Sequence, residues 1–394
     1  MYIIHTLNCR SHMCACMVCM YVHTYAELQV LCRVGGAMAS EGERRHDDAL
    51  SVAALRRTLA ATGLLRSGIA GRDEEDDRLL LLRFLRARKM DVAKAAAMWE
   101  AMIRWRDQME EVLAAGAAGE FPLRPEEIQI AREFHPRGYH GVDKGGRPLY
   151  IELLGNSDPQ KLLEAISLER YVAHRSAEAE HMQITRIPAC SLAFGSRIEA
   201  QMVVIDVAGI GMKNFNASAR QLLGAIQHVL GQFYPETLHS LYIINASRSF
   251  RFVWAWIRPF LDPATVARIH ILGHDYTTTL LEVVDADQLP SFLGGKCTCP
   301  GDKGGCIWSD KGPWNDAAIL ERLGRLRPNK QTPPVMSSPL STYSFSSKVL
   351  DLQQRISAAE AEHAHIKMLL KKVLSKQDEV LNMLQDLGVK QCRH

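Results

Sequence analysis

Short runs of apolar residues alternate with longer amphipathic stretches from about residue 134 of the chain onward. Continuous apolar runs are typical of strands buried on both faces, as in a parallel sheet, and amphipathic stretches are typical of helices. Strands that alternate with helices predict an α/β architecture with right-handed crossovers. The predicted strands are Tyr139–Val142, Pro148–Glu152, Met202–Val207, Leu241–Asn245 and Ile269–Leu272, and the predicted helices are Leu168–Met182, Asn216–Phe233 and Phe250–Phe260.

A pair of predicted helices precedes the α/β segment. Asp76–Asp77 place negative charge at the start of the first helix, where the helix dipole favours it. A short link leads to the second helix, Val92–Trp105, for which Asp91 is a suitable N-cap. The N-terminal part is therefore expected to be helical.

A heptad pattern follows a linker rich in proline and serine, Pro328–Ser347. Positions spaced alternately by three and four residues run from Val349 to Leu387, and all are apolar except His363 and Gln377. Such a stripe predicts a coiled coil, formed with a partner protein or with a second copy of the chain. The alternative is a single amphipathic helix that folds back on the body of the protein.

Composition limits the kind of protein. The 394 residues carry a net charge of +3, too small to predict nucleic-acid binding, and 47% of them are hydrophobic, as in ordinary soluble domains. The longest apolar run near the N-terminus, Met13–Val22, is shorter than the roughly 20 residues that span a bilayer. Residues 1–37 are interpreted as a disordered or spurious leader, because Met38 begins a segment typical of a cytosolic start.

The 10 cysteines are not spread like a disulfide framework, and a chain of this length does not need such staples. Cys297, Cys299 and Cys306 lie close together in the sequence, but three thiols without a placed fourth ligand argue against a metal site. The sequence also lacks the G-x-S-x-G, G-x-x-x-x-G-K-[ST] and H-E-x-x-H motifs. We therefore predict no catalytic residues, no metal ion and no cofactor.

Five blocks of sequence occur in a specific order within about residues 75–320. The blocks are Leu81–Lys89, Gly138–Pro148, Val204–Gly209, Tyr234–Pro263 and Leu289–Trp314. In these blocks the chain resembles the CRAL-TRIO lipid-transfer family. It is most similar to the phosphatidylinositol/phosphatidylcholine transfer proteins of plants, in a short form without a nodulin-like tail.

The resemblance implies the CRAL-TRIO fold, a helical lobe beside an α/β lobe whose mixed, mostly parallel sheet lines an apolar lipid pocket. It implies a carrier that encloses one phospholipid, expected to be phosphatidylinositol, and exchanges it at membrane surfaces. Such a protein would be cytoplasmic and peripherally associated with Golgi or plasma membrane, would serve lipid kinases, and would support phosphoinositide signalling and vesicle transport. The expected segments are the leader at 1–37, a polar segment at 38–75, the helical lobe at 76–127, the lipid-binding lobe at 128–302, a trailing segment and linker at 303–347, and the coiled coil at 348–388.

The family's inositol-headgroup site maps onto five positions, which are Arg88, Lys89, Glu236, Thr265 and Arg268. The three basic side chains would neutralise the phosphate through charge-assisted hydrogen bonds. Glu236 can accept hydrogen bonds from ring hydroxyls, and Thr265 can donate or accept. Arg268 replaces a lysine of the fungal members, which keeps the charge and changes the donor geometry.

The family's phosphatidylcholine site, in contrast, maps onto Gln201 and Val203, where the family pattern has Ser and Thr. Val203 has no group that hydrogen-bonds a phosphate, so binding of this second lipid is not predicted. The resemblance also makes the segment Ser249–Leu261 a membrane gate, whose apolar members are expected to enter the membrane interface. These members are Phe250, Phe252, Trp254, Trp256, Ile257 and Phe260.

Two other functions are compatible with the same fold. One is a carrier of a different hydrophobic ligand, such as a tocopherol-like or sterol-like lipid, which the change at Gln201 and Val203 favours. The other is an interaction protein whose coiled coil carries the function while the pocket senses lipid. The basic residues of the headgroup site argue for the phospholipid carrier.

Overall fold

The computed structural model describes residues 47–66, 69, 74–210, 216–247, 250, 254, 258, 266–301 and 305–326. The predicted leader, the linker and the coiled coil lie outside these residues, as does most of the predicted gate. No helix within the described ranges is both long enough and apolar enough to cross a membrane.

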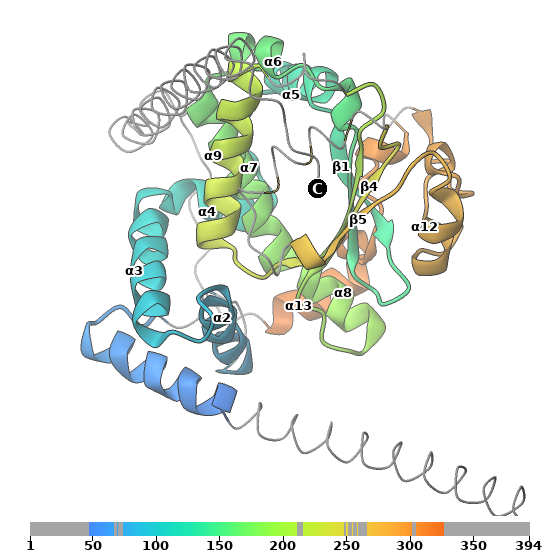
Figure 1. Ribbon diagram of the computed structural model, residues 1–394. Helices are drawn as coiled ribbons and strands as arrows, with labels where there is room; N and C mark the ends of the chain where they lie inside the picture. Colours follow the sequence, from blue (N-terminus) through green and yellow to red (C-terminus); the bar gives the residue numbers. More distant parts are fainter. Residues whose placement is uncertain are drawn as a thin grey trace, which may run out of the picture.

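A sheet of five strands forms the centre of the α/β lobe (Figure 1). Strand β1 runs antiparallel to β2, whereas β2, β3, β4 and β5 are mutually parallel and lie side by side in that order. The five predicted strands are confirmed, with ends that differ by at most three residues. The observed bounds are Arg137–Val142 for β1, Pro148–Glu152 for β2, Gln201–Asp206 for β3, Leu238–Ile244 for β4 and Ile269–Ile271 for β5.

The N-terminal lobe is helical, as the sequence predicts. It contains a helix over residues 47–61 and the helices α2 (Glu74–Ala87), α3 (Val92–Gln108), α4 (Glu110–Ala118) and α5 (Pro125–Phe134). Asp91 caps α3, because its Oδ1 accepts a hydrogen bond from the Lys94 amide at 3.0 Å. Leu55, Phe84 and Trp99 are buried where the first helix, α2 and α3 meet.

Helices cover both faces of the sheet (Figure 1). One face packs on α12 (Thr277–Val283) through alternate strand residues such as Met202, Val204 and Tyr242. The other face is turned toward α4, α7 and α9. Within the described ranges the other α-helices are α6 (Pro159–Ala165), α7 (Leu168–His181), α8 (Ile187–Phe194), α9 (Ala217–Phe233) and α13 (Ala317–Leu326), and a π-helical turn (Met182–Arg186) joins α7 to α8.

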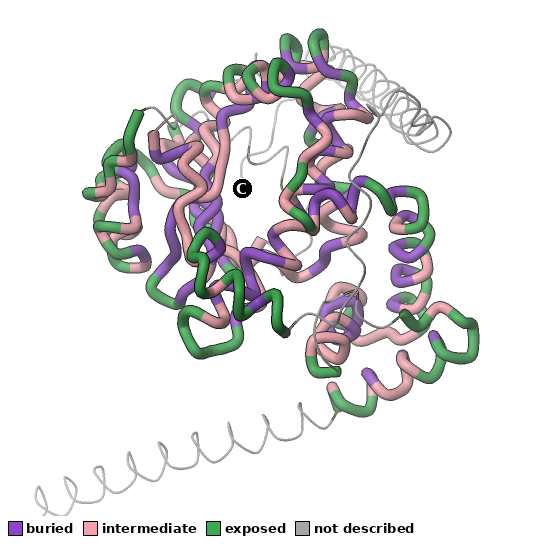
Figure 2. Tube along the Cα trace, turned by 180° about the vertical axis from the view of Figure 1, so that it is seen from behind, coloured by how far each residue is buried: buried purple, intermediate pink, exposed green. Residues whose placement is uncertain are grey.

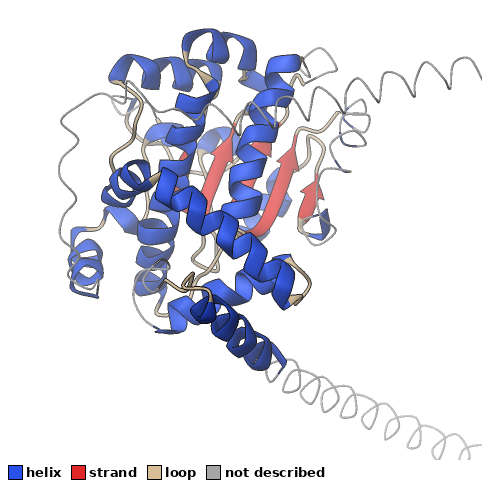
Figure 3. Cartoon of the chain, turned by 90° about the vertical axis from the view of Figure 1, so that its left-hand side faces the viewer, coloured by secondary structure: helices blue, strands red, loops and turns tan. Residues whose placement is uncertain are grey.

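A buried ion pair joins the helical lobe to the α/β lobe. Arg106 of α3 donates two hydrogen bonds, of 3.0 and 2.7 Å, to the carboxylate of Glu180 on α7. Tyr234, just after α9, donates a third to the same carboxylate at 2.8 Å. Figure 2 shows buried residues, in purple, along many of the helices and strands, and Figure 3 shows helices in front of the strands. The two lobes therefore share polar as well as apolar contacts.

Candidate functional site

Glu236 and Arg268, both predicted headgroup residues, form an ion pair. Arg268 Nη2 donates to Glu236 Oε2 at 2.6 Å, and Arg268 Nη1 donates to the Leu238 carbonyl at 2.7 Å. The Arg268 side chain is 33% exposed and the Glu236 side chain is 19% exposed, so the pair is partly accessible to a ligand. Glu236 itself has a positive φ of 58°, rare for a residue with a side chain, and such backbone geometry concentrates at functional sites.

The basic pair of the helical lobe lies at the end of α2. The chain turns sharply there, with positive φ at both Lys89 and Met90. Arg88 Nη2 donates to Gln232 Oε1 on the last turn of α9 at 2.8 Å. Gln232 precedes Glu236 by only four residues, so this contact brings the two halves of the predicted site toward each other. Lys89 is exposed, and Thr265 lies outside the described residues.

Two of the predicted gate residues are described, and both belong to an apolar cluster that includes residues of the sheet. Phe250 is buried in a cluster with Val207 and Ile243, and Trp254 packs partly buried against the same cluster. Leu241 and Ile269 extend this apolar surface across β4 and β5. Phe252, Trp256, Ile257 and Phe260 lie outside the described residues.

The positions of the second-lipid site are occupied by other contacts. Gln201 Oε1 accepts a hydrogen bond from the Tyr139 hydroxyl at 2.9 Å. Val203 is buried and lies in register between Tyr150 of β2 and Leu241 of β4. Neither the Gln201 nor the Val203 side chain has a hydroxyl, whereas the Ser and Thr of the family pattern have one each.

A buried network of charged side chains, which the sequence reasoning missed, connects β1 and β2 with α7. Arg137 Nη1 and Arg175 Nη1 both donate to Glu178 Oε2 at 2.6 Å. Arg137 Nε also donates to the Tyr171 hydroxyl at 3.1 Å. Arg137 and Arg175 are 6% and 11% exposed, which makes Glu178 their necessary counter-charge.

A second carboxylate completes this network. His135 lies 2.7 Å from the Tyr171 hydroxyl and 3.0 Å from Glu152 Oε1, so a neutral imidazole can accept from the first and donate to the second. Burial alone would raise the pKa of Glu152, but His135 and two arginines lower it to about 2. The network therefore balances the charges of Arg137 and Arg175 with two ionised carboxylates.

The sequence signal for this network is weak but present. Arg137 is the first residue of β1, and Glu152 is the last residue of the apolar strand β2. Tyr171, Arg175 and Glu178 are spaced by four and three residues, which places them on one face of α7. Each pattern alone is typical of a solvated surface, so only the packing of α7 on the sheet identifies the buried network.

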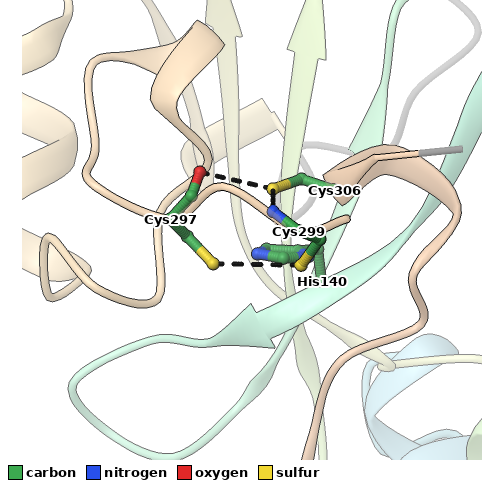
Figure 4. A group of neighbouring side chains, drawn as sticks. All are labelled: His140, Cys297, Cys299 and Cys306. Carbon is green, nitrogen blue, oxygen red and sulfur yellow. Dashed lines mark hydrogen bonds between the residues drawn. The ribbon is translucent and has the colours of Figure 1, made fainter. Parts of the chain in front are cut away.

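Four possible metal ligands gather elsewhere, at the outer edge of the sheet (Figure 4). The ligand atoms of His140, Cys297, Cys299 and Cys306 all lie within 4.8 Å of one another. The sequence argument against a metal ion was the lack of a fourth ligand. That premise is wrong, because β1 places His140 beside the three cysteines.

We expect stability to fall below neutral pH, and His135 to contribute to this dependence. Burial outweighs the attraction of Glu152 and lowers the pKa of His135 in the fold, whereas the unfolded chain restores the usual value of about 6.5. As pH falls through that value, the unfolded state binds more protons than the folded state. One such histidine therefore lowers the free energy of unfolding by up to about 1.4 kcal/mol per pH unit.

Urea unfolding of wild type and His135→Gln between about pH 7 and 5 measures this dependence. The free energy of unfolding should change less steeply with pH in the variant than in wild type. The exposed His274→Gln is the control; an equal slope for His135→Gln and wild type would contradict the assignment.

The fold and the site define a helical lobe joined to an α/β lobe, with basic and acidic side chains at the junction. Residues 135–295 match the profile of the CRAL/TRIO domain, and residues 55–101 match that of the CRAL/TRIO N-terminal domain. The chain belongs to the CRAL/TRIO family.

Named relatives refine this class. The chain is 45% identical over 287 residues to phosphatidylinositol/phosphatidylcholine transfer protein SFH7 of Arabidopsis thaliana, covering 72% of this chain and 50% of that one. It is also 45% identical over 251 residues to phosphatidylinositol/phosphatidylcholine transfer protein SFH12 of Arabidopsis thaliana. That match covers 64% of this chain and 45% of that one. It is 36% identical to the Sec14 cytosolic factor of Schizosaccharomyces pombe, covering 64% of this chain and 85% of that one. The chain thus spans about half the length of the plant relatives it matches.

Proposed function

We propose that this protein is a phosphatidylinositol transfer protein, which encloses one phospholipid and exchanges it at membrane surfaces. The observation that carries the proposal is the ion pair of Glu236 and Arg268, with Arg88 held near it through Gln232. The names of the plant and yeast relatives support the same activity. The proposed activity is binding and exchange, with no covalent step.

The charges of the site suit an inositol phospholipid. Arg88, Lys89 and Arg268 carry three positive charges against one negative charge on Glu236, which leaves an excess for a phosphodiester. The Glu236 carboxylate can accept from inositol hydroxyls, which choline lacks. A bound headgroup would therefore exchange the pairing of Arg268 with Glu236 for contacts with phosphate and hydroxyls.

The acyl chains require an apolar enclosure. A two-chain phospholipid exposes about 30 methylene groups, and at roughly 0.8 kcal/mol each their bare transfer through water costs on the order of 20 kcal/mol. The apolar surface formed by Leu241, Ile243 and Ile269 is the part of the sheet suited to cover such chains, with Phe250 and Trp254 packed on it. Opening of the gate segment at a membrane would release them.

The cellular setting belongs to the same proposal. We infer a cytoplasmic carrier that visits Golgi or plasma membrane peripherally, presents its lipid to lipid kinases, and uses the coiled coil for self-association or a partner. The exposed Arg258, within the gate segment, is suited to contact anionic headgroups.

Mass spectrometry of the lipid that co-purifies with the chain tests the ligand directly. We expect phosphatidylinositol, and vesicle assays with labelled lipid should show its transfer. A sterol or tocopherol in place of phospholipid, with no transfer of inositol lipid, would contradict the proposal in favour of the other hydrophobic carrier.

Phosphatidylcholine transfer is expected to be weak or absent. The Val203 side chain offers no hydrogen bond, and the Gln201 amide oxygen already accepts one from the Tyr139 hydroxyl. The same vesicle assay with labelled phosphatidylcholine measures this, and the double variant Gln201→Ser/Val203→Thr should gain transfer because it restores two hydroxyls. Wild-type phosphatidylcholine transfer equal to that of phosphatidylinositol would refute the argument from Val203.

A further inference from the structure

We propose that His140, Cys297, Cys299 and Cys306 bind one zinc ion that fastens the segment after the sheet to strand β1. Their ligand atoms lie within 4.8 Å of one another, and the sulfurs of Cys297 and Cys299 are 4.0 Å apart. Zinc bonds of about 2.3 Å to sulfur and 2.0–2.1 Å to nitrogen imply tetrahedral edges of roughly 3.5–3.8 Å. A small contraction of side chains therefore completes the geometry.

His140 is prepared as a ligand. Its side chain is fully buried, and Nδ1 lies 2.9 Å from the Ser309 hydroxyl. Nε2 is also buried, yet it has no hydrogen-bond partner among the described residues. A metal-binding imidazole commonly uses one nitrogen for the metal and the other for such an outer hydrogen bond, which orients the ring. A zinc ion would satisfy the buried nitrogen.

Hydrogen-bond donors face two of the three sulfurs. The Cys299 amide donates to Cys306 Sγ at 3.3 Å, and Lys311 Nζ donates to Cys297 Sγ at 3.2 Å. Three thiolates and a zinc ion carry a net charge of −1, which the Lys311 ammonium offsets. All three cysteines are free, and a disulfide between Cys297 and Cys299 would need its sulfurs at about 2.05 Å.

The ligand set identifies both the metal and its role. Thiolate-rich sites with one imidazole select zinc over magnesium or calcium, which prefer oxygen ligands. Four protein ligands leave no open position for a substrate, so the site is structural. Strand β1 and the segment that follows Cys306 also lie close together along their backbones. A Cβ on Gly138 of β1 would meet the Ile307 carbonyl oxygen at 1.9 Å.

The ion would anchor a segment that reaches the proposed lipid-binding lobe. Shortly after Cys306, Asp310 accepts hydrogen bonds from Arg186, at 3.1 Å to each carboxylate oxygen. The Arg186 guanidinium lies 4.2 Å from the centre of the Tyr139 ring. Tyr139 in turn donates to Gln201. A chain of side-chain contacts therefore connects the segment after Cys306 to Gln201 of the second-lipid site. The proposed zinc binding does not depend on the proposed function.

The experiment uses the full chain with the six cysteines outside the described residues changed to serine, so that they bind no metal. These are Cys9, Cys14, Cys16, Cys19, Cys32 and Cys392. Reconstituted under reducing conditions, this chain should retain about one zinc per molecule. Adding Cys306→Ser should weaken binding by more than the roughly 100-fold that loss of an outer-shell partner costs. Adding Cys190→Ser, a buried cysteine outside the cluster, is the matched control and should retain the zinc.

Cobalt substitution gives a second measurement, and its first arm needs no ligand variant. The chain with its cluster intact should show the thiolate-to-cobalt charge transfer and the intense d–d bands of a tetrahedral site with three sulfurs. His140→Asn should alter the d–d bands while keeping the charge transfer. Failure to bind zinc under reducing conditions, equal loss in the Cys190→Ser chain, or a cobalt spectrum without sulfur ligands would each overturn the proposal.

Discussion

The double variant Glu236→Ala/Arg268→Ala is expected to lose phosphatidylinositol transfer to the background rate. The two side chains would contact the phosphate and the inositol hydroxyls, and hydrogen bonds to charged groups contribute about 1.5–3 kcal/mol each. Losing two such partners weakens binding by at least about 100-fold. Vesicle-to-vesicle transfer of labelled phosphatidylinositol measures the effect.

Two controls separate loss of the site from loss of the fold. Arg268→Lys keeps the charge and should retain part of the transfer, because a lysine can contact the phosphate but not as a planar fork. The partly exposed pair contributes little to folding, so the double variant should melt within a few degrees of wild type. A folded double variant that transfers inositol lipid at the wild-type rate would show that the headgroup binds elsewhere.

The variant Glu178→Ala is expected to lose about 3–5 kcal/mol of unfolding free energy, because it leaves two buried arginines without their shared counter-charge. Burial alone would raise the pKa of Glu178, but Arg137, His174 and Arg175 hold it well below its usual range. The folded protein therefore depends on the ionised carboxylate. Urea unfolding at neutral pH measures the loss through the shift of the midpoint.

A matched pair on the surface provides the comparison. Glu100 pairs with Arg104 on α3, but these side chains are 39% and 67% exposed. Glu100→Ala should change stability by less than about 0.5 kcal/mol, since exposed pairs at this spacing contribute little. Equal losses from Glu178→Ala and Glu100→Ala would refute the buried network as a source of stability. The quadruple variant Arg137→Met/Glu152→Gln/Arg175→Met/Glu178→Leu should recover much of the loss, because it removes both arginines and both carboxylates of the network.

The sequence alone determined the order of the five strands and of the helices α2, α3, α7 and α9. Apolar runs such as Met202–Val207 are buried on both faces of the sheet, so their pattern does not depend on knowing the partner strands. The ordered blocks also predicted Glu236 and Arg268 as members of one site, and the structure brings these two into direct contact. For Arg88 the structure adds the contact with Gln232, which no local pattern indicates.

Tertiary structure alone decided which polar residues are buried and which ligands meet. Arg175 and Glu178 have the sequence pattern of an ordinary solvated helix face, and Arg137 lies on strand β1. Only the packing of α7 on β1 and β2 removes these three side chains from water. His140 is separated from Cys297 by more than half of the described chain, yet β1 brings it beside the three cysteines. The physical reason is the same in both cases. Hydrophobic periodicity is a local property of the chain, whereas burial of a charge and completion of a ligand set depend on segments that only folding brings together.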